Sequence, residues 1–428
     1  MRAYGPAPRR WKLASNTIRA RNCKHIVQAF AIGQPFFRAF GTMPQSRLYL
    51  DHNATSPLRP EAADAVAAAL RLPGNASSIH AEGRAARAVI EAARAQVAAL
   101  VGARAKNVVF TSGGTEAANL ALTPGFSRAG SPRPVRLLVG ATEHACVLQG
   151  HRFEAAAVTR IACGPDGAID LAALRAALAK GGPAMLALQA ANNETGLLQP
   201  VAEAATLVHA VGGVVVCDAV QFCGKLPCDI GALGADALFL SAHKFGGPKG
   251  AGALVFAADS LHLAEPLLRG GGQERGLRAG TENIAAIAGF GAAAGAAAFG
   301  LAAQAAMQAS LRAALEAGIR AAAPDAVFFG EEAARLPNTA SFAIPGVRAE
   351  TLLIALDLAG VAASSGSACS SGKVAPSHVL AAMGVAPELA SGALRLSTGW
   401  STTAAEAANF GERFAAVIQR LRQARAAA

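Results

Sequence analysis

Residues 110–122, FTSGGTEAANLAL, are typical of a buried strand that ends in a glycine-containing turn and the start of a helix. Backbone N–H groups at the start of a helix bind phosphate well, and Thr115 adds a hydroxyl beside them. Any strand-to-helix crossover can carry a Gly-Gly-Thr turn, so the stretch alone does not decide a function. It does indicate the fold, because the same alternation of strand and helix continues beyond it.

From Arg59 to about Ala258 the chain alternates short apolar strands with amphipathic or alanine-rich helices. The predicted strands are residues 107–112, 135–141, 184–191, 213–219, 235–242 and 252–257. The predicted helices are residues 79–101, 170–180 and 201–210. Strands that are apolar throughout and separated by helices are typical of a mostly parallel sheet covered on both faces. We therefore expect an α/β domain in this part of the chain.

A different order follows, beginning with a long helical stretch over residues 283–323. Short strands in DAVFFG, NTASFAIPG and GALRLSTG then alternate with the helix AETLLIALDLA and a last helix from about Thr403. This order predicts a small α+β domain, to which the early strand RLYLDH returns. We expect a basic arm at 1–46, a large α/β domain at 59–300, and a small domain formed by 47–58 with 301–428.

The composition of 428 residues, 53% hydrophobic and 16% charged, predicts a globular chain with a large core. The net charge of +11 is concentrated near the start, where residues 1–42 carry eight basic residues and no acidic one. The remaining 31 basic and 28 acidic residues leave a charge of only +3. A nearly neutral body gives no reason to expect a nucleic-acid partner, although a basic nucleic-acid binder is the alternative from another functional class.

The basic arm has two interpretations. It resembles an organelle transit peptide, or it is upstream sequence that precedes a natural start at Met43, which we favour. We accordingly expect a cytoplasmic protein, with an organelle matrix as the alternative. One uncharged run, Ile284 to Ala303, is long enough to cross a bilayer, but Ala and Gly dominate it. A tightly packed buried helix is the better interpretation, so no membrane partner is expected.

Seven cysteines, an odd number without framework spacing, indicate free thiols in a reducing compartment. Cys217, Cys223 and Cys228 lie close in sequence, but no CxxC pair or neighbouring histidine supports a zinc site. We interpret them as small buried side chains and expect no resident metal.

A remaining cysteine, Cys369, lies in residues 364–372, SSGSACSSG, where small residues predict a mobile loop that can carry a nucleophile. Lys244, in LFLSAHKFGGPKG, follows the most apolar run of the eight lysines. This position predicts a desolvated, nucleophilic amine suited to a Schiff base. Lys249, in the turn that follows, is expected to be exposed.

Polar residues follow several predicted strands, whose carboxyl ends meet in one crevice of a parallel sheet. Asp218 is there either a helix N-cap or the partner of a protonated pyridine nitrogen. His144 either stacks on an aromatic cofactor or is merely solvated. Asn193 offers an amide to a ligand, and the guanidinium of Arg395 suits a carboxylate unless it is a surface charge.

The chain as a whole resembles the cysteine desulfurases of the NifS/IscS kind, in the class V branch of fold-type I pyridoxal-phosphate enzymes. The matching motifs span the chain from about Arg47 to the last helix. They are LDHNATSPL, GNASSIH, FTSGGTEAANLAL, TEHACVL, NNETG, CDAVQ, SAHKFGGPKG, GGGQERGLRAGTEN and SSGSACSSG.

The resemblance implies pyridoxal 5'-phosphate as cofactor, with Lys244 as its Schiff-base lysine and Cys369 as the residue that accepts sulfur. It places the substrate against Asn53, Asn193 and Arg395. The other residues that it implies at the cofactor are Gly114, Thr115, His144, Asp218, Gln221, Ser241, His243 and Thr281. Of these, Thr281 would reach the phosphate of the neighbouring subunit, which implies a homodimer with shared sites.

The implied activity converts L-cysteine to L-alanine and leaves a persulfide on Cys369. An acceptor protein for Fe–S cluster assembly or for other sulfur-containing products would then take the sulfur. Cys369 would also make any transient contact with an Fe–S cluster. The alternatives are a selenocysteine lyase or another class V enzyme, such as an aminotransferase, and the sequence leaves the acceptor and its pathway open.

Overall fold

The structure is a computed structural model of the chain that describes residues 47–365 and 376–426. The predictions for the basic arm, Met43 and Cys369 fall outside these residues. The described residues from Arg47 onward belong to one compact unit.

Within the described residues, seven strands form the main sheet, in the order β2-β9-β8-β7-β6-β4-β5. Only β9 runs antiparallel to its neighbours, so the predicted mostly parallel α/β sheet is confirmed. In sheet order the strands are Val108–Thr111, Gly252–Phe256, Ala237–Ser241, Val214–Asp218, Ala184–Gln189, Arg136–Gly140 and Val158–Ile161. The edge strand β5 escaped prediction because only its last residue is buried, so it lacks the apolar run of the others.

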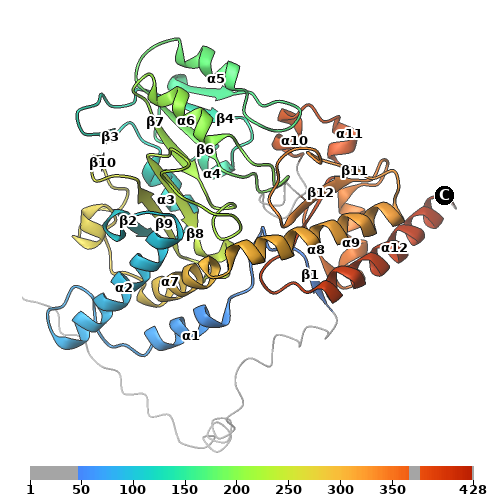
Figure 1. Ribbon diagram of the computed structural model, residues 1–428, viewed down its shortest axis with the longest axis horizontal. Coiled ribbons are helices and arrows are strands. Elements are labelled where there is room, and N and C mark those ends of the chain that lie inside the picture. The colour runs from blue at the N-terminus through green and yellow to red at the C-terminus, as the bar shows by residue number, and fades with distance from the viewer. Residues whose placement is uncertain (1–46, 366–375, 427–428) are drawn as a thin grey trace, which may run out of the picture. The chain divides into compact units, whose positions relative to one another are not determined.

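Helices cover both faces of this sheet (Figure 1). Alternate residues of each strand enter different cores: Val214 and Val216 lie in one cluster, and Val215 and Cys217 lie in the other. The first of these clusters contains side chains from α3, Gly114–Ala121, and α4, Ala145–Leu148. The second is formed with α2, Ala81–Leu100, α5, Leu171–Leu178, α6, Val201–His209, and α7, Ile284–Ala298.

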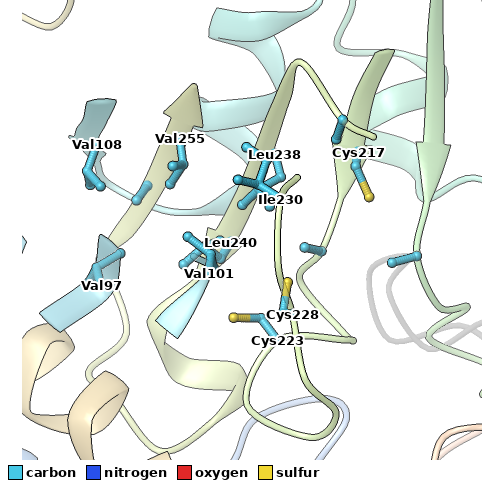
Figure 2. Close-up of a cluster of buried hydrophobic side chains, with 14 of the residues drawn as sticks. Val97, Val101, Val108, Cys217, Cys223, Cys228, Ile230, Leu238, Leu240 and Val255 are labelled. Atoms are coloured by element: carbon cyan, nitrogen blue, oxygen red, sulfur yellow. The ribbon is translucent and has the colours of Figure 1, made fainter. Parts of the chain in front are cut away.

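Figure 2 shows the second cluster, which contains Val97 of α2 and Val101, the residue after α2, which lies beside Leu240 of β8. Cys223 and Cys228 lie beside each other at its margin. Both cysteines and Cys217 are buried free thiols, as the sequence predicted.

The long helical stretch is interrupted, because α7 ends at Ala298 and α8, Leu301–Ala322, sets off at 78° to it. Gly300 at the junction has φ +66°, a left-handed conformation that glycine adopts without a steric penalty. The helical stretch predicted over residues 283–323 is therefore confirmed, but it is divided into two helices. No single described helix is long and apolar enough to cross a membrane, and only this bent pair passes by length and composition.

The C-terminal elements build a second, smaller sheet and its own core. Strands β11, Val327–Phe328, β12, Thr339–Ala343, and β14, Leu394–Ser397, are antiparallel, and α8 packs against α12, Ala404–Ala426 (Figure 1). The early strand β1, Leu48–Tyr49, pairs with β13, Val361–Ala362, next to α9, Ala349–Leu358. This pairing places the first described strand among the C-terminal elements. The boundaries of the two domains stay a prediction.

The remaining elements are short. They are α1, Pro60–Ala69, β3, Phe126–Arg128, β10, Leu261–Leu263, α10, His378–Ala382, and α11, Pro387–Ala390.

Candidate active site

A cavity opens at the carboxyl ends of the parallel strands, and the predicted site residues meet there. Asp218 ends β7, Ser241 ends β8, and the turn after β8 carries His243 and Lys244. Each predicted site residue that the structure describes, except Thr281, lines this cavity: Asn53, Gly114, Thr115, His144, Asn193, Asp218, Gln221, Ser241, His243, Lys244 and Arg395.

Lys244 is half-buried, and its amine donates hydrogen bonds to the backbone carbonyls of Asn53, at 2.8 Å, and Ala54, at 3.0 Å. The apolar run before Lys244 predicted a desolvated amine there, yet Lys225 is more deeply buried, at 5% exposure. An apolar run before a lysine reflects only the neighbouring sequence. The burial of Lys225 depends instead on segments that are distant along the chain. Lys249 is exposed, as predicted.

Two acidic side chains are buried at the site, Asp218 in the wall of the cavity and Glu143 outside its lining. Burial raises the pKa of Asp218 to about 6, although its carboxylate accepts a hydrogen bond from the Val220 N–H at 2.9 Å. Burial, followed by the charge of Asp218, raises the pKa of Glu143 well above its usual range. Glu143 accepts the N–H of Gln189 through Oε1, while its buried Oε2 has no hydrogen-bond partner. Asp218 is thus a costly buried charge that a cation in the cavity would stabilise.

His144 begins helix α4 and accepts the Cys146 N–H on Nδ1 at 3.1 Å. Because Nδ1 is the acceptor, the neutral ring carries its proton on Nε2. Burial lowers the pKa of His144, and the charges of Lys244 and His378 lower it further. The site therefore holds His144 as a neutral imidazole.

The start of helix α3 forms one end of the site. A second hollow continues the cavity along Gly114, Thr115, Ser241 and His243. A Cβ on Gly252 of β9 would lie 2.4 Å from the carbonyl carbon of Gly113, so this strand approaches the turn too closely for any side chain. The exposed N–H groups at this helix start suit a phosphate.

His243 lies beside that helix start, where its Nδ1 is 3.0 Å from the hydroxyl of Thr55. Burial, followed by the charges of Lys244 and Lys249, lowers the pKa of His243 to about 4. The ring is therefore neutral at pH 7, and it can contribute a hydrogen bond but no charge.

Arg395 also lines the cavity and is 4% exposed. Its Nη2 donates to Asp51 Oδ1 at 2.7 Å, and its Nη1 donates to the backbone carbonyl of Asn193 at 2.8 Å. The buried Nε of Arg395 has no hydrogen-bond partner. A buried, unsatisfied guanidinium N–H in a cavity wall is suited to an anionic ligand such as a carboxylate.

Cys369 lies outside the described residues, but residues that flank segment 366–375 have hydrogen bonds near the cavity. Ser364 pairs with Arg395 through two backbone hydrogen bonds. After the loop, Ser377 donates to the carboxylate of Glu194, and His378 Nε2 lies 2.9 Å from the backbone carbonyl of Glu143.

Within the part of the chain that the structure describes, Cys146 is the thiol that lines the cavity. Burial raises its pKa far above the ordinary value, and the charges of Asp218 and Glu143 add to the effect. A thiol that stays protonated is a poor nucleophile, so Cys146 is unsuited to attack a substrate.

Thr281 lines a different hollow, together with Ser112, Arg278 and Asn283. Its expected role lies in a neighbouring subunit, and a single chain does not test that role.

Sequence reasoning missed Glu143, Cys146 and Lys225. Glu143 directly precedes His144 in the motif TEHACVL, which also contains Cys146, so their place at the same strand end was a usable signal. For Lys225 the local sequence gave none, because the segments that bury its amine lie far away along the chain.

The Aminotransferase class-V family model matches residues 48–410. An IscS-like cysteine desulfurase of Mycobacterium tuberculosis is 40% identical over 388 residues, which cover 89% of this chain and 98% of the relative. A cysteine desulfurase of Cereibacter sphaeroides is 43% identical and covers 88% of this chain and 97% of its own. The solved structure of a NifS-like protein from Rickettsia africae is similar at a TM-score of 0.78 and 32% identity, over 87% of this chain and 99% of that one.

Proposed function

The chain belongs to the class-V aminotransferase family, and we propose that it is a cysteine desulfurase that uses pyridoxal 5'-phosphate to convert L-cysteine to L-alanine. The relatives that carry this name match almost their whole length. The single observation that best supports the proposal is the cavity that unites Lys244, Asp218 and Arg395 near Ser364 and His378, which flank the segment that carries Cys369.

The residues of the cavity fit this cofactor. Asp218, with its pKa raised by burial, suits the protonated ring nitrogen, and the start of α3 with Thr115 suits the phosphate. Lys244 offers an amine for the aldehyde, while the neutral ring of His144 offers a stacking surface. When bound, pyridoxal phosphate supplies an electron sink for reactions at the amino-acid Cα.

Three kinds of residue in the chain have separate roles toward the cofactor and the substrate. Asp218 holds the proton on the ring nitrogen, and Arg395 binds the substrate carboxylate beside Asn193 and Asn53. Lys244 Nζ would then act as the base that accepts the proton from the substrate Cα.

Cys369 Sγ, as thiolate, forms a bond to the sulfur of the substrate while the substrate's carbon–sulfur bond breaks. The carbon that loses sulfur takes up a proton, Lys244 returns a proton to Cα, and the product is released as alanine. The sulfur stays on Cys369 as a persulfide.

The decisive experiment measures alanine formed from L-cysteine without any keto acid. Wild type should form alanine, and Cys369→Ala should bind the cofactor and cysteine yet form none. Cys163→Ala, a change outside the cavity, is the matched control and should turn over normally. Normal turnover by Cys369→Ala would contradict the assignment, and a requirement for a keto acid would favour an aminotransferase.

Mass spectrometry of the native protein complements this assay, because a persulfide adds the mass of one sulfur at Cys369. A homodimer that shares Thr281 across its sites, a protein acceptor for Fe–S assembly and a cytoplasmic location complete the proposal. Selenocysteine lyase is the alternative, and selenide release that greatly exceeds sulfide release from matched substrates would favour it.

A further inference from the structure

Lys225 is buried behind the cavity without lining it. It follows β7 by seven residues, in a turn between the buried thiols Cys223 and Cys228. Burial lowers the pKa of this amine well below its usual value, and the charges of Lys244 and Arg395 lower it further. None of the ion pairs found among the described residues involves Lys225, so no carboxylate offsets the cost of burying it.

The amine of Lys225 instead donates hydrogen bonds to the side-chain amides of two residues that line the cavity. Nζ donates to Gln221 Oε1 at 2.7 Å and to Asn53 Oδ1 at 2.8 Å. An ammonium group has three N–H donors and a neutral amine has two, so either form can make both bonds.

These bonds decide which way each amide points, because an amide presents an acceptor at one end and a donor at the other. With Oε1 against Lys225, Gln221 turns its Nε2 donor toward the backbone carbonyl of Asn53, at 3.0 Å. That same carbonyl accepts the amine of Lys244 at 2.8 Å. The amide of Asn53 is oriented likewise, since its Oδ1 faces Lys225 and its Nδ2 donates to Thr339 Oγ1 at 2.9 Å.

We propose that Lys225 is a positioning residue, which holds Gln221 with its donor end toward the cofactor cavity and fixes Asn53 beside Lys244. The inference rests on the proposed function in that the ligand it prepares for is pyridoxal phosphate. Lys225 acts through Gln221 and Asn53, and it need not touch the cofactor or the substrate.

The test is a double-mutant cycle read out as the dissociation constant of pyridoxal phosphate, titrated into enzyme freed of its cofactor. The variants are Lys225→Met, Gln221→Ala and the double variant, with the exposed Lys180→Met as matched control. Removal of one hydrogen bond of the charge-assisted kind weakens binding roughly tenfold, so Lys225→Met and Gln221→Ala should each do so. If Lys225 acts mainly through Gln221, the double variant should bind no more than about threefold more weakly than Gln221→Ala alone.

A purely structural lysine would give a different result. The two fold-changes would then multiply in the double variant, which would overturn the proposal, as would binding by Lys225→Met within twofold of wild type. Lys180→Met should bind as wild type does.

A second variant covers the case in which Lys225→Met does not fold. Lys225→Gln keeps two N–H donors without the charge, and it should bind pyridoxal phosphate within about threefold of wild type. Loss of binding in a Lys225→Gln protein with an unchanged melting temperature would overturn the donor role. If neither variant folds, Lys225 is a structural residue and the proposal fails.

The titration separates this inference from the proposed function. If the wild type binds pyridoxal phosphate but forms no alanine, the assignment as a desulfurase is wrong. The double-mutant cycle would still test the role of Lys225 in cofactor binding. Wild type that does not bind the cofactor would end both.

Discussion

Asp218→Asn should make the cofactor-free protein more stable at pH 8, although it removes a residue of the active site. Asparagine keeps the shape of the side chain and an oxygen for the Val220 N–H. What it removes is a carboxylate that is buried at the end of β7, where ionisation is costly.

The raised pKa gives the size of the effect. Burial shifts the pKa of Asp218 from 3.8 to about 6 in the folded protein, and each pKa unit corresponds to about 1.4 kcal/mol. Below pH 3.8 both the folded and the unfolded chain bind the proton, so the group has no effect on stability. Between pH 3.8 and 6 only the unfolded chain loses it, and stability falls as the pH rises. Above pH 6 the loss levels off at an upper limit of about 3 kcal/mol.

The assay is urea or thermal unfolding of cofactor-free wild type and Asp218→Asn from pH 4 to 8. The variant should gain stability relative to wild type up to about pH 6, and the gain should then stay constant. Saturating pyridoxal phosphate should stabilise wild type more than the variant, because Asp218 then has a cationic partner. A difference that does not change with pH, or a variant less stable at pH 8, would refute the reasoning.

Asp236→Asn provides a control of opposite sign. Burial alone would raise the pKa of Asp236, but hydrogen bonds from His209, the Val215 N–H and Arg128 outweigh it and lower the pKa. Its charge therefore stabilises the fold above the unfolded pKa, and this stability is lost as the pH falls through the folded pKa. At pH 8 Asp236→Asn should be less stable than wild type.

Three further predictions concern the cavity. Lys244→Ala should lose the visible absorption of a lysine-bound cofactor, and an unchanged spectrum would contradict its role. Arg395→Ala removes hydrogen bonds to a charged substrate group, which are worth about 1.5–3 kcal/mol. The value of kcat/KM should therefore fall roughly 10- to 150-fold. A change below twofold would place Arg395 away from the substrate. Gly252→Ala forces a Cβ to within 2.4 Å of the Gly113 carbonyl carbon and should weaken cofactor binding about tenfold by shifting the start of α3. Gly272→Ala, where a Cβ meets open space, is its control, and equal affinities of the two variants would contradict the prediction.

The framework of the site could be predicted from short stretches of sequence. Runs such as VVVC (214–217) and ALFL (237–240) are apolar at every position, and a strand buried on both faces needs that pattern. Once the strands are parallel, their carboxyl ends share one edge of the sheet. His144, Asp218 and Lys244 therefore had to meet, and the structure places them around one cavity.

Tertiary packing decided which polar groups are desolvated and how they are oriented. Asn53 comes from a distant part of the chain to accept the amine of Lys225, Asn338 donates to the same oxygen of Asn53, and no local pattern reveals that. Arg395 likewise has its ion pair with Asp51 only because β14 bridges to the segment after β1. Strand formation depends on neighbouring residues, whereas the burial of a charge depends on every segment that packs over it, and only the folded chain brings those segments together.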